Sequence, residues 1–213
     1  MAPAGAQREA FAMTPRQRVI QILRSATAAR IRFSFPTATG RVTIARQSFE
    51  RVARAIERGR VHVATVRNFR QGVAAQYDPA NNTLEVPPII GRVDEGLVLH
   101  ECTHCVYDLL RTGITAADDE ASAYVVSSLY FRMTGLRPPR WGAEPHKTAG
   151  VVADGLLQQY QAGNVAVPQV DPNDFLGLRL VVMTHPVYFM PGLQRGDFRL
   201  GLPITGGSYT HNG

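Results

Sequence analysis

The sequence predicts an α+β fold with a small mixed or antiparallel sheet. Stretches with helical spacing of apolar residues alternate with short β-branched runs, and a hairpin pattern stands directly before the most apolar helix. The chain has 213 residues, of which 45% are hydrophobic and 8% aromatic, and this suits one domain with a sizeable core. We expect a flexible N-terminus over residues 1–13 and a single domain over 14–213. Its parts would be a basic helical part (14–60), a core part (61–134) and a helical and irregular part (135–213).

Two helices and one strand are expected in the basic part. Residues 14–29 form a helix that Thr14 caps and that has Pro15 at its first position. Residues 48–59 form a second amphipathic helix, which ends at Gly59. Residues 31–35 alternate between apolar and polar types and indicate a short strand, which Pro36 stops.

Three strands are expected before the central helix. Residues 61–66, 73–77 and 83–86 each have the composition of a strand. The turn at 78–82 joins the last two as a hairpin. We expect 83–87 to be an edge strand, to which an extended peptide could add as a further strand.

The stretch 94–112 is predicted to be a helix with Asp94 as its N-cap and Gly113 beyond its end. It contains the motif His100-Glu101-x-x-His104, which is typical of zinc-dependent hydrolases. On a helix, the two imidazoles stand about 40° apart around the axis and about 6 Å apart along it, so both can reach one metal ion. Glu101 lies about 100° round from His100, where its carboxylate can act on a water molecule as a general base.

The two cysteines, Cys102 and Cys105, lie inside the same helix. A CxxC pair can indicate a redox or zinc site. On a helix, however, both sulfurs point about 140–200° away from His100, toward the packed side. We therefore expect reduced core cysteines, as in a reducing compartment.

A catalytic zinc ion takes three protein ligands and keeps a fourth position open. The pattern from Thr115 to Asp118 predicts the start of a helix over 116–134, which Gly135 ends. Glu120 on this helix is the candidate third ligand, with Asp119 in reserve, although the helix dipole alone also favours acids in a first turn. Further helices are expected over 148–161 and 173–183, and the tail from residue 191 is expected to be irregular and to cover part of the cleft.

The order of hairpin, HExxH helix and a helix with Glu120-Ala121-Ser122-Ala123-Tyr124 resembles the gluzincin-type zinc metallopeptidases. It is similar in particular to small bacterial zinc-peptidase domains of the ImmA/IrrE kind and to those attached to contractile injection systems. The resemblance covers residues 61–134. It implies a zincin-like fold, a Zn²⁺ cofactor carried by His100, His104 and Glu120, and hydrolysis of a peptide or protein substrate with Glu101 as the base. The chain departs from the family in having cysteines on the metal helix and no obvious fused DNA-binding module.

Peptide hydrolysis also needs a donor that stabilises the oxyanion. The residues that could supply it are Tyr124, His146, His185, Tyr188 and Tyr209. Tyr124, which belongs to the quoted motif, is retained as the catalytic candidate. Asp108, one turn after His104, is a candidate for orienting that imidazole, or else a plain surface acid.

The formal charge of +6 is unevenly distributed. Residues 1–70 contain 14 arginines against three glutamates, a balance of +11, whereas residues 71–213 contain nine basic and 14 acidic side chains. Such asymmetry indicates either a solvated helical face or a docking surface, for which an acidic protein is the expected partner. No recognition-helix motif is present, so a nucleic-acid-binding protein is only a third, less supported hypothesis; it predicts salt-dependent retention of DNA or RNA that is lost when residues 1–60 are removed.

No apolar run reaches the length of a membrane span, and the N-terminus lacks the apolar block of a secretory signal. We expect a cytoplasmic protein, with export by a specialised secretion system as an alternative. The leading hypothesis is a zinc-dependent metallopeptidase. The alternative is a catalytically inactive, zinc-stabilised binding or structural protein that docks through its basic N-terminal third.

Overall fold

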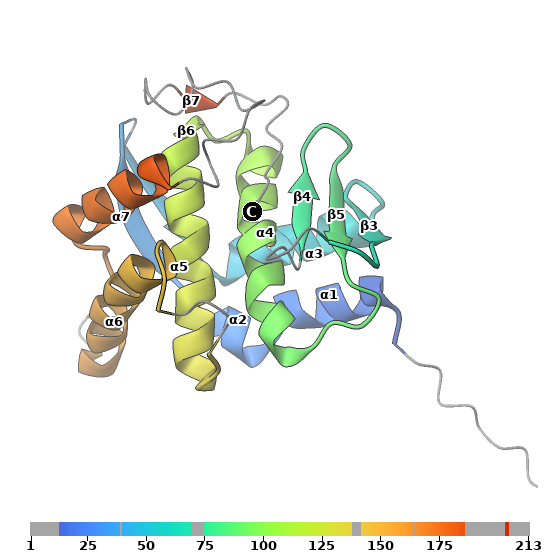
Figure 1. Ribbon diagram of the computed structural model, residues 1–213, viewed down its shortest axis with the longest axis horizontal. Helices are drawn as coiled ribbons and strands as arrows, with labels where there is room; N and C mark the ends of the chain where they lie inside the picture. The colour runs from blue at the N-terminus through green and yellow to red at the C-terminus, as the bar shows by residue number, and fades with distance from the viewer. Residues whose placement is uncertain are drawn as a thin grey trace, which may run out of the picture.

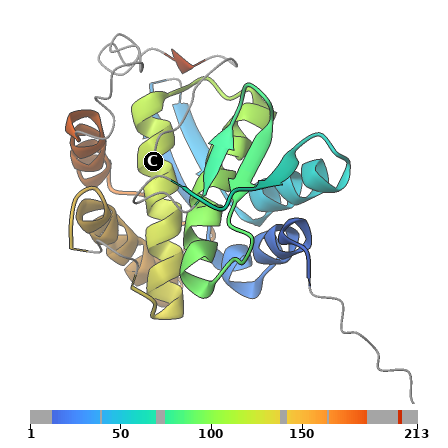
Figure 2. The same ribbon diagram turned by 45° about the vertical axis from the view of Figure 1, so that its right-hand side comes forward.

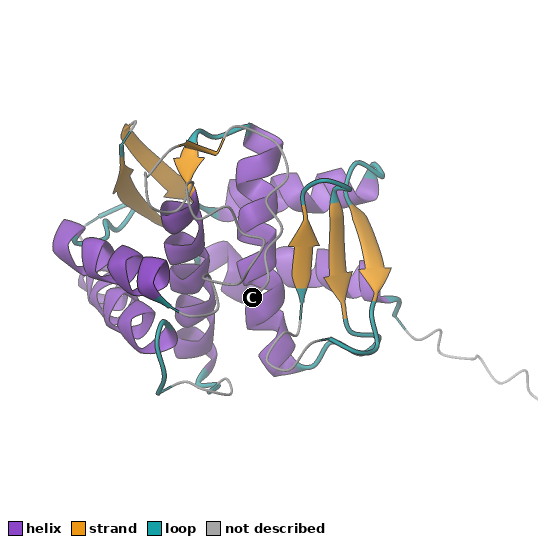
Figure 3. Cartoon of the chain, turned by 45° about the horizontal axis from the view of Figure 1, so that its top comes forward, coloured by secondary structure: helices purple, strands orange, loops and turns teal. Residues whose placement is uncertain are grey.

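A computed structural model describes residues 13–38, 40–69, 75–137, 142–163, 165–185 and 203–204. Its two longest helices, α4 (Arg92–Leu110) and α5 (Ala116–Thr134), lie antiparallel side by side through the middle of the molecule (Figure 1). A three-stranded sheet lies on one side of this pair, and α6 (His146–Ala162) and α7 (Pro172–Thr184) lie on the other (Figure 3). The architecture confirms an α+β fold with small mixed and antiparallel sheets.

The three-stranded sheet contains β3 (His62–Thr65), β4 (Gln76–Asp78) and β5 (Thr83–Val86) in the order β3-β5-β4. β4 pairs antiparallel with β5, which confirms the hairpin, and β3 pairs parallel with β5. The prediction of an edge strand over 83–87 is wrong, because β5 has a neighbour on each side. The hydrophobic pattern of a strand specifies which face is buried but not where the strand lies in the sheet. The edge strand next to α4 is β4.

The helix predicted over 14–29 is divided into α1 (Pro15–Leu23) and α2 (Ala26–Arg30), both of which lie below α3 in the view of Figure 2. Ser25 causes the division, because its backbone is extended and its hydroxyl accepts a hydrogen bond from the N–H of Ala28. This is the arrangement of an N-cap, which starts a new helix. The predicted helix 48–59 is confirmed as α3 (Arg46–Glu57), followed by Gly59 with a left-handed φ of 70°.

The strand expected over 31–35 extends further than predicted. It is β1 (Phe33–Thr37), which pairs antiparallel with β2 (Gly40–Ile44), a strand that was not predicted. Pro36 lies opposite Arg41 inside the ladder instead of ending it. Each strand of a two-stranded sheet has an open side, so a residue without an N–H can be accommodated there.

The ends of α4 differ from those predicted. Asp94 is not the N-cap: it lies in the first turn, and its carboxylate accepts a hydrogen bond of 2.8 Å from the N–H of Gly91, which is the N-cap. The helix stops before Gly113, because Arg111 takes a left-handed backbone conformation (φ 49°, ψ 42°) directly after Leu110. The short segment that remains between the two helices folds α5 back along α4.

A glycine allows the two long helices to approach closely. A Cβ atom on Gly96 would lie 2.5 Å from Cζ of Phe131 and 2.9 Å from Cδ1 of Tyr130, both on α5. Any larger residue there would push the helices apart. Because Gly96 lies one turn before His100, this contact also sets the distance from His100 to α5.

The helices after α4 confirm their predictions closely. Thr115 caps α5 by accepting a hydrogen bond from the N–H of Asp118, and Gly135 ends α5 with a φ of 68°. α6 and α7 match the helices predicted over 148–161 and 173–183. β6 (Ile114–Thr115), directly before α5, pairs antiparallel with β7 (Pro203–Ile204). The rest of the tail predicted from residue 191, and residues 1–12, lie outside the described residues.

Buried apolar side chains form one cluster that extends from Val19 in α1 to Val182 in α7. The cluster surrounds the middle of α4, where the polar motif lies. None of the helices in the described part of the chain combines the length and the apolar character that a bilayer crossing needs.

Candidate metal centre

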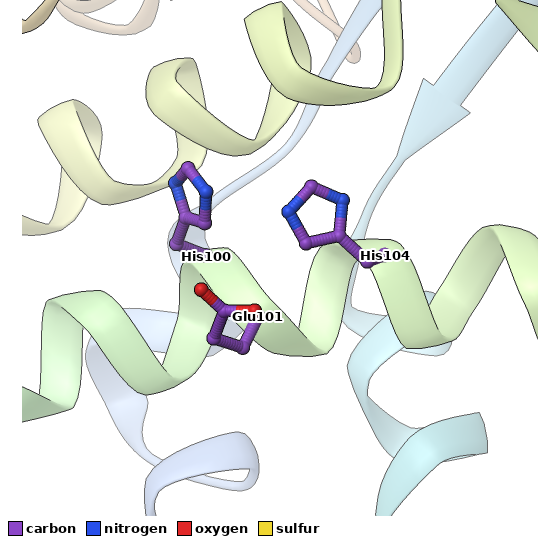
Figure 4. A group of neighbouring side chains, drawn as sticks. All are labelled: His100, Glu101 and His104. Carbon is purple, nitrogen blue, oxygen red and sulfur yellow. The ribbon is translucent and has the colours of Figure 1, made fainter. Parts of the chain in front are cut away.

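His100 and His104 project from one face of α4 toward α5 (Figure 4). Their ring centroids are 5.0 Å apart, and both side chains are buried. One potential ligand atom from each of His100, Glu101 and His104 lies within 4.8 Å of the other two. The structure therefore brings together the three residues of the predicted motif.

α5 places a carboxylate beside one member of this group, His100, although Glu120 is not among the residues whose ligand atoms all lie within 4.8 Å of one another. Oε2 of Glu120 lies 3.5 Å from Nε2 of His100, and Glu120 is completely buried. Ligands that sit about 2.0–2.2 Å from a tetrahedral zinc ion are about 3.4 Å from each other. Glu120 and His100 thus have the separation of two ligands on one ion. A donor set of two imidazoles and one carboxylate suits Zn²⁺, so the residues present fit this metal.

Asp119, the reserve ligand, lies against His104. Its Oδ1 is 2.6 Å from Nδ1 of His104, and both groups are buried. A carboxylate on Nδ1 fixes the orientation of the ring and directs Nε2 toward a ligand. Asp119 therefore serves as the partner that orients His104.

Asp108, which was a candidate for that role, does not contact His104 in this way. Its Oδ2 accepts a hydrogen bond of 2.7 Å from the hydroxyl of Tyr77 on β4. Tyr77 thus holds the carboxylate of Asp108 beside β4, and Asp119 is the acid that lies against Nδ1 of His104. The prediction that Asp108 orients His104 is wrong for this reason.

Asp118 is tied to α7. Its Oδ1 lies 2.9 Å from Nε of Arg179, and its Oδ2 accepts a hydrogen bond of 2.8 Å from the hydroxyl of Thr115. Burial raises the pKa of Asp118, and the Thr115 hydroxyl and the Arg179 guanidinium oppose that rise. The pair anchors the first turn of α5, the turn that carries Asp119 and leads to Glu120.

Glu101 contacts the edge strand. Its Oε2 accepts a hydrogen bond of 2.9 Å from the backbone N–H of Tyr77, in a buried environment. This bond fixes one carboxylate oxygen beside β4. The carboxylate therefore lies between the edge strand and the two imidazoles.

One candidate oxyanion donor, Tyr124, lies beside His100, and a second, His146, lies beside Tyr124. The ring of Tyr124 stands edge-on against His100 with a centroid distance of 4.8 Å, and His146 stands edge-on against Tyr124 at 5.1 Å. His185 is the C-cap residue of α7. Tyr188 and Tyr209 lie outside the described residues.

Cys102 and Cys105 are free and buried, which confirms the prediction of reduced core cysteines. Burial raises the pKa of both thiols, so they remain protonated at neutral pH. They take no part in the group around His100.

Two contributions to the site gave no signal in the sequence. Arg179 is distant from Asp118 along the chain, and the donor on Tyr77 is a backbone N–H, which any residue other than proline would supply. Comparisons of the chain with protein-family models, with curated proteins and with solved structures find no significant match.

Proposed function

We propose that the protein is a zinc-dependent metallopeptidase with a zincin-like fold, which hydrolyses peptide bonds in a peptide or protein substrate. The observation that carries the proposal is the 3.5 Å separation between Nε2 of His100 and Oε2 of Glu120, two groups from different helices. Together with His104 they supply the three protein ligands of a catalytic zinc site. The group is buried within an apolar core, where polar side chains need hydrogen bonds, ion pairs or a metal ion as partners.

Each residue near the ligands has a chemical task in this proposal. Zn²⁺ bound there would supply Lewis-acid polarisation of a carbonyl group and would lower the pKa of water. The Glu101 carboxylate takes a proton from the attacking water and passes it to the departing amine. Asp119 keeps the His104 ring in place, and Tyr124 or His146 donates a hydrogen bond to the oxyanion.

The sheet gives the proposal a place for the substrate. β4, rather than β5, runs beside Glu101, so an extended peptide would lie along β4. The N–H of Tyr77 is already bonded to Glu101 and is not open to a peptide while that bond holds. Backbone groups alternate in direction along a strand and those of Gln76 and Asp78 face β5, so pairing of a peptide with β4 would require this bond to open.

One observation favours the alternative, a zinc-stabilised binding or structural protein without turnover. Because Glu101 accepts the N–H of Tyr77, it has a structural use that needs no catalysis. A metal assay alone does not separate the two functions, since both bind zinc. Cleavage has to be measured.

The test is Glu101→Gln, compared with the wild type on a peptide library with and without a chelator. Glutamine keeps a carbonyl oxygen for the N–H of Tyr77 but cannot take up a proton. We expect full zinc content, an unchanged melting temperature and a loss of turnover of at least about 100-fold. His104→Ala is the comparison variant, which should lose zinc and stability together.

Three outcomes would contradict the proposal. Undiminished turnover in Glu101→Gln would remove Glu101 as the base. Cleavage that a chelator leaves unchanged would exclude a role of the metal ion in hydrolysis. A zinc-loaded wild type that cleaves nothing in the library would favour the binding protein.

A further inference from the structure

The outer face of α3 carries a row of arginines, which we define as Arg51, Arg54 and Arg58. All three are exposed, and their spacing of i, i+3 and i+7 puts them on one side of the helix over about 10 Å. Arg46 and Arg60, also exposed, stand at the two ends of the same segment. The row concentrates part of the positive charge of the N-terminal third on one surface.

The acidic residues of α3 form no ion pair with this row, although one Arg24 cation shared by two carboxylates leaves a net charge of −1 and Glu50 acts on Arg54 through space. Both of them, Glu50 and Glu57, bind Arg24, with Nη-to-Oε distances of 2.9 Å and 2.6 Å. Hydrogen bonds from Arg24 lower the pKa of both carboxyls, which keeps them charged and occupied. Among the residues that the structure describes, no acidic side chain lies within ion-pair distance of the row.

The row has opposing effects on the stability of α3: Arg54 stands in the last turn, where the helix dipole favours a cation. Arg54 and Arg58 are like charges one turn apart, an arrangement that disfavours a helix. Their guanidinium groups make no hydrogen bond within the described part of the chain, in contrast to Arg16, whose Nη2 donates to the carbonyl of Ile56 at 2.9 Å. The row is therefore available to a partner.

The chemistry of the face indicates which partner fits. The apolar residues of α3 are all buried: Phe49, Val52, Ala53, Ala55 and Ile56. Protein–protein interfaces centre on apolar and aromatic side chains, and proteins that bind single-stranded nucleic acid stack bases on exposed aromatic rings. The exposed part of α3 offers neither. It offers guanidinium groups, which bind phosphate oxygens in pairs.

We propose that the arginine row binds the phosphate backbone of double-stranded nucleic acid without sequence specificity. A duplex presents one negative charge per about 1.7 Å of its axis, so a straight row of cations can meet several phosphates in any register. Charge alone favours an acidic protein equally well, but such a partner would find no apolar anchor on α3. The inference does not depend on the metal site.

The experiment measures binding of the full chain to a labelled random-sequence DNA duplex by fluorescence anisotropy between about 50 and 200 mM salt. Three phosphate contacts give a slope of log K against log salt of about −2.7, which is a loss of affinity of about 40-fold over that range. The variant Arg51→Gln/Arg54→Gln/Arg58→Gln should lose this slope and at least about tenfold of the affinity at the lowest salt. All three side chains are exposed, so the variant should keep the wild-type circular dichroism spectrum.

The matched control is Arg92→Gln/Arg111→Gln/Arg137→Gln, which removes the same charge from exposed positions outside α3. We expect its affinity to stay within about twofold of the wild type. Equal losses in the two triple variants would overturn the proposal, because net charge alone would then explain binding. Failure of the wild type to bind the duplex, tighter binding of a single strand, or equally strong competition by polyglutamate would overturn it as well.

Discussion

Charged side chains have partners in the first turns of α5 but form no ion pair on the outer face of α3, within the described residues. Three consecutive acidic residues of α5 are buried, and each has its own partner: Asp118 has the guanidinium of Arg179, Asp119 has Nδ1 of His104 and Glu120 has Nε2 of His100. The exposed arginine row of α3 faces no acid within the described residues. Burial removes the solvation of a charge, so an internal charge needs a partner, whereas water and salt screen an exposed one. Paired acids therefore build the site, and the unpaired cations remain available to an external partner.

The largest effect should come from breaking a buried pair. Arg179→Met leaves Asp118 buried without its cation, and we expect the free energy of unfolding in urea to fall by about 3 kcal/mol. The double variant Asp118→Asn/Arg179→Met should recover more than half of this loss, because both charges are then absent. In the exposed arginine row, by contrast, Arg54→Met should change the free energy of unfolding by less than about 0.5 kcal/mol. Equal effects of Arg179→Met and Arg54→Met would remove the distinction between the two regions.

A smaller effect should appear in metal affinity when a matched acid loses its charge. Asp119→Asn keeps an oxygen that can accept from Nδ1 of His104 but has no carboxylate to hold the ring. We expect zinc to bind about 10–100-fold more weakly in competition with a chromophoric chelator, with little change in the melting temperature of the metal-free protein. Asp154→Asn is the control, since Asp154 is exposed and pairs with Arg132 on the surface. If the two variants bind zinc equally well, Asp119 does not orient a ligand.

The smallest effect concerns the two ion pairs that Arg24 forms with Glu50 and Glu57, beside the arginine row. Arg24 lowers the pKa of Glu50 and Glu57 in the folded protein below the value of about 4.3 that glutamate has in an unfolded chain. The stabilisation is therefore present above about pH 4.3 and is lost as the pH falls through the folded-state values. Melting temperatures of the wild type and Arg24→Gln should differ slightly near neutral pH and converge in acid. Solvent screening keeps the difference small, and a difference that does not vary with pH would exclude this origin.

Local signals were sufficient for the helices with strong caps or long apolar faces. α5, α6 and α7 lie within about two residues of their predicted ends, and a capping side chain (Thr115, Asp171) or a glycine (Gly135, Gly163) marks four of the six boundaries. A serine can cap a helix or lie within one. The predicted helix 14–29 includes Ser25, whereas in the structure Ser25 is the N-cap of a new helix, α2. The predictions that Pro36 ends its strand and that 83–87 is an edge strand are wrong. Both depend on the neighbouring strands, which decide whether a proline can be accommodated and where a strand lies in its sheet.

The spacing of His100, Glu101 and His104 was enough by itself to put both imidazoles on one face of α4 and both cysteines on the other. Helix geometry fixes those directions whatever surrounds the helix. Only the tertiary structure decided which acid meets which base, with Glu120 at His100, Asp119 at His104 and Asp118 at Arg179. Those contacts depend on how closely α5 folds back against α4 and on where α7 packs, and no local pattern in the chain encodes such distances.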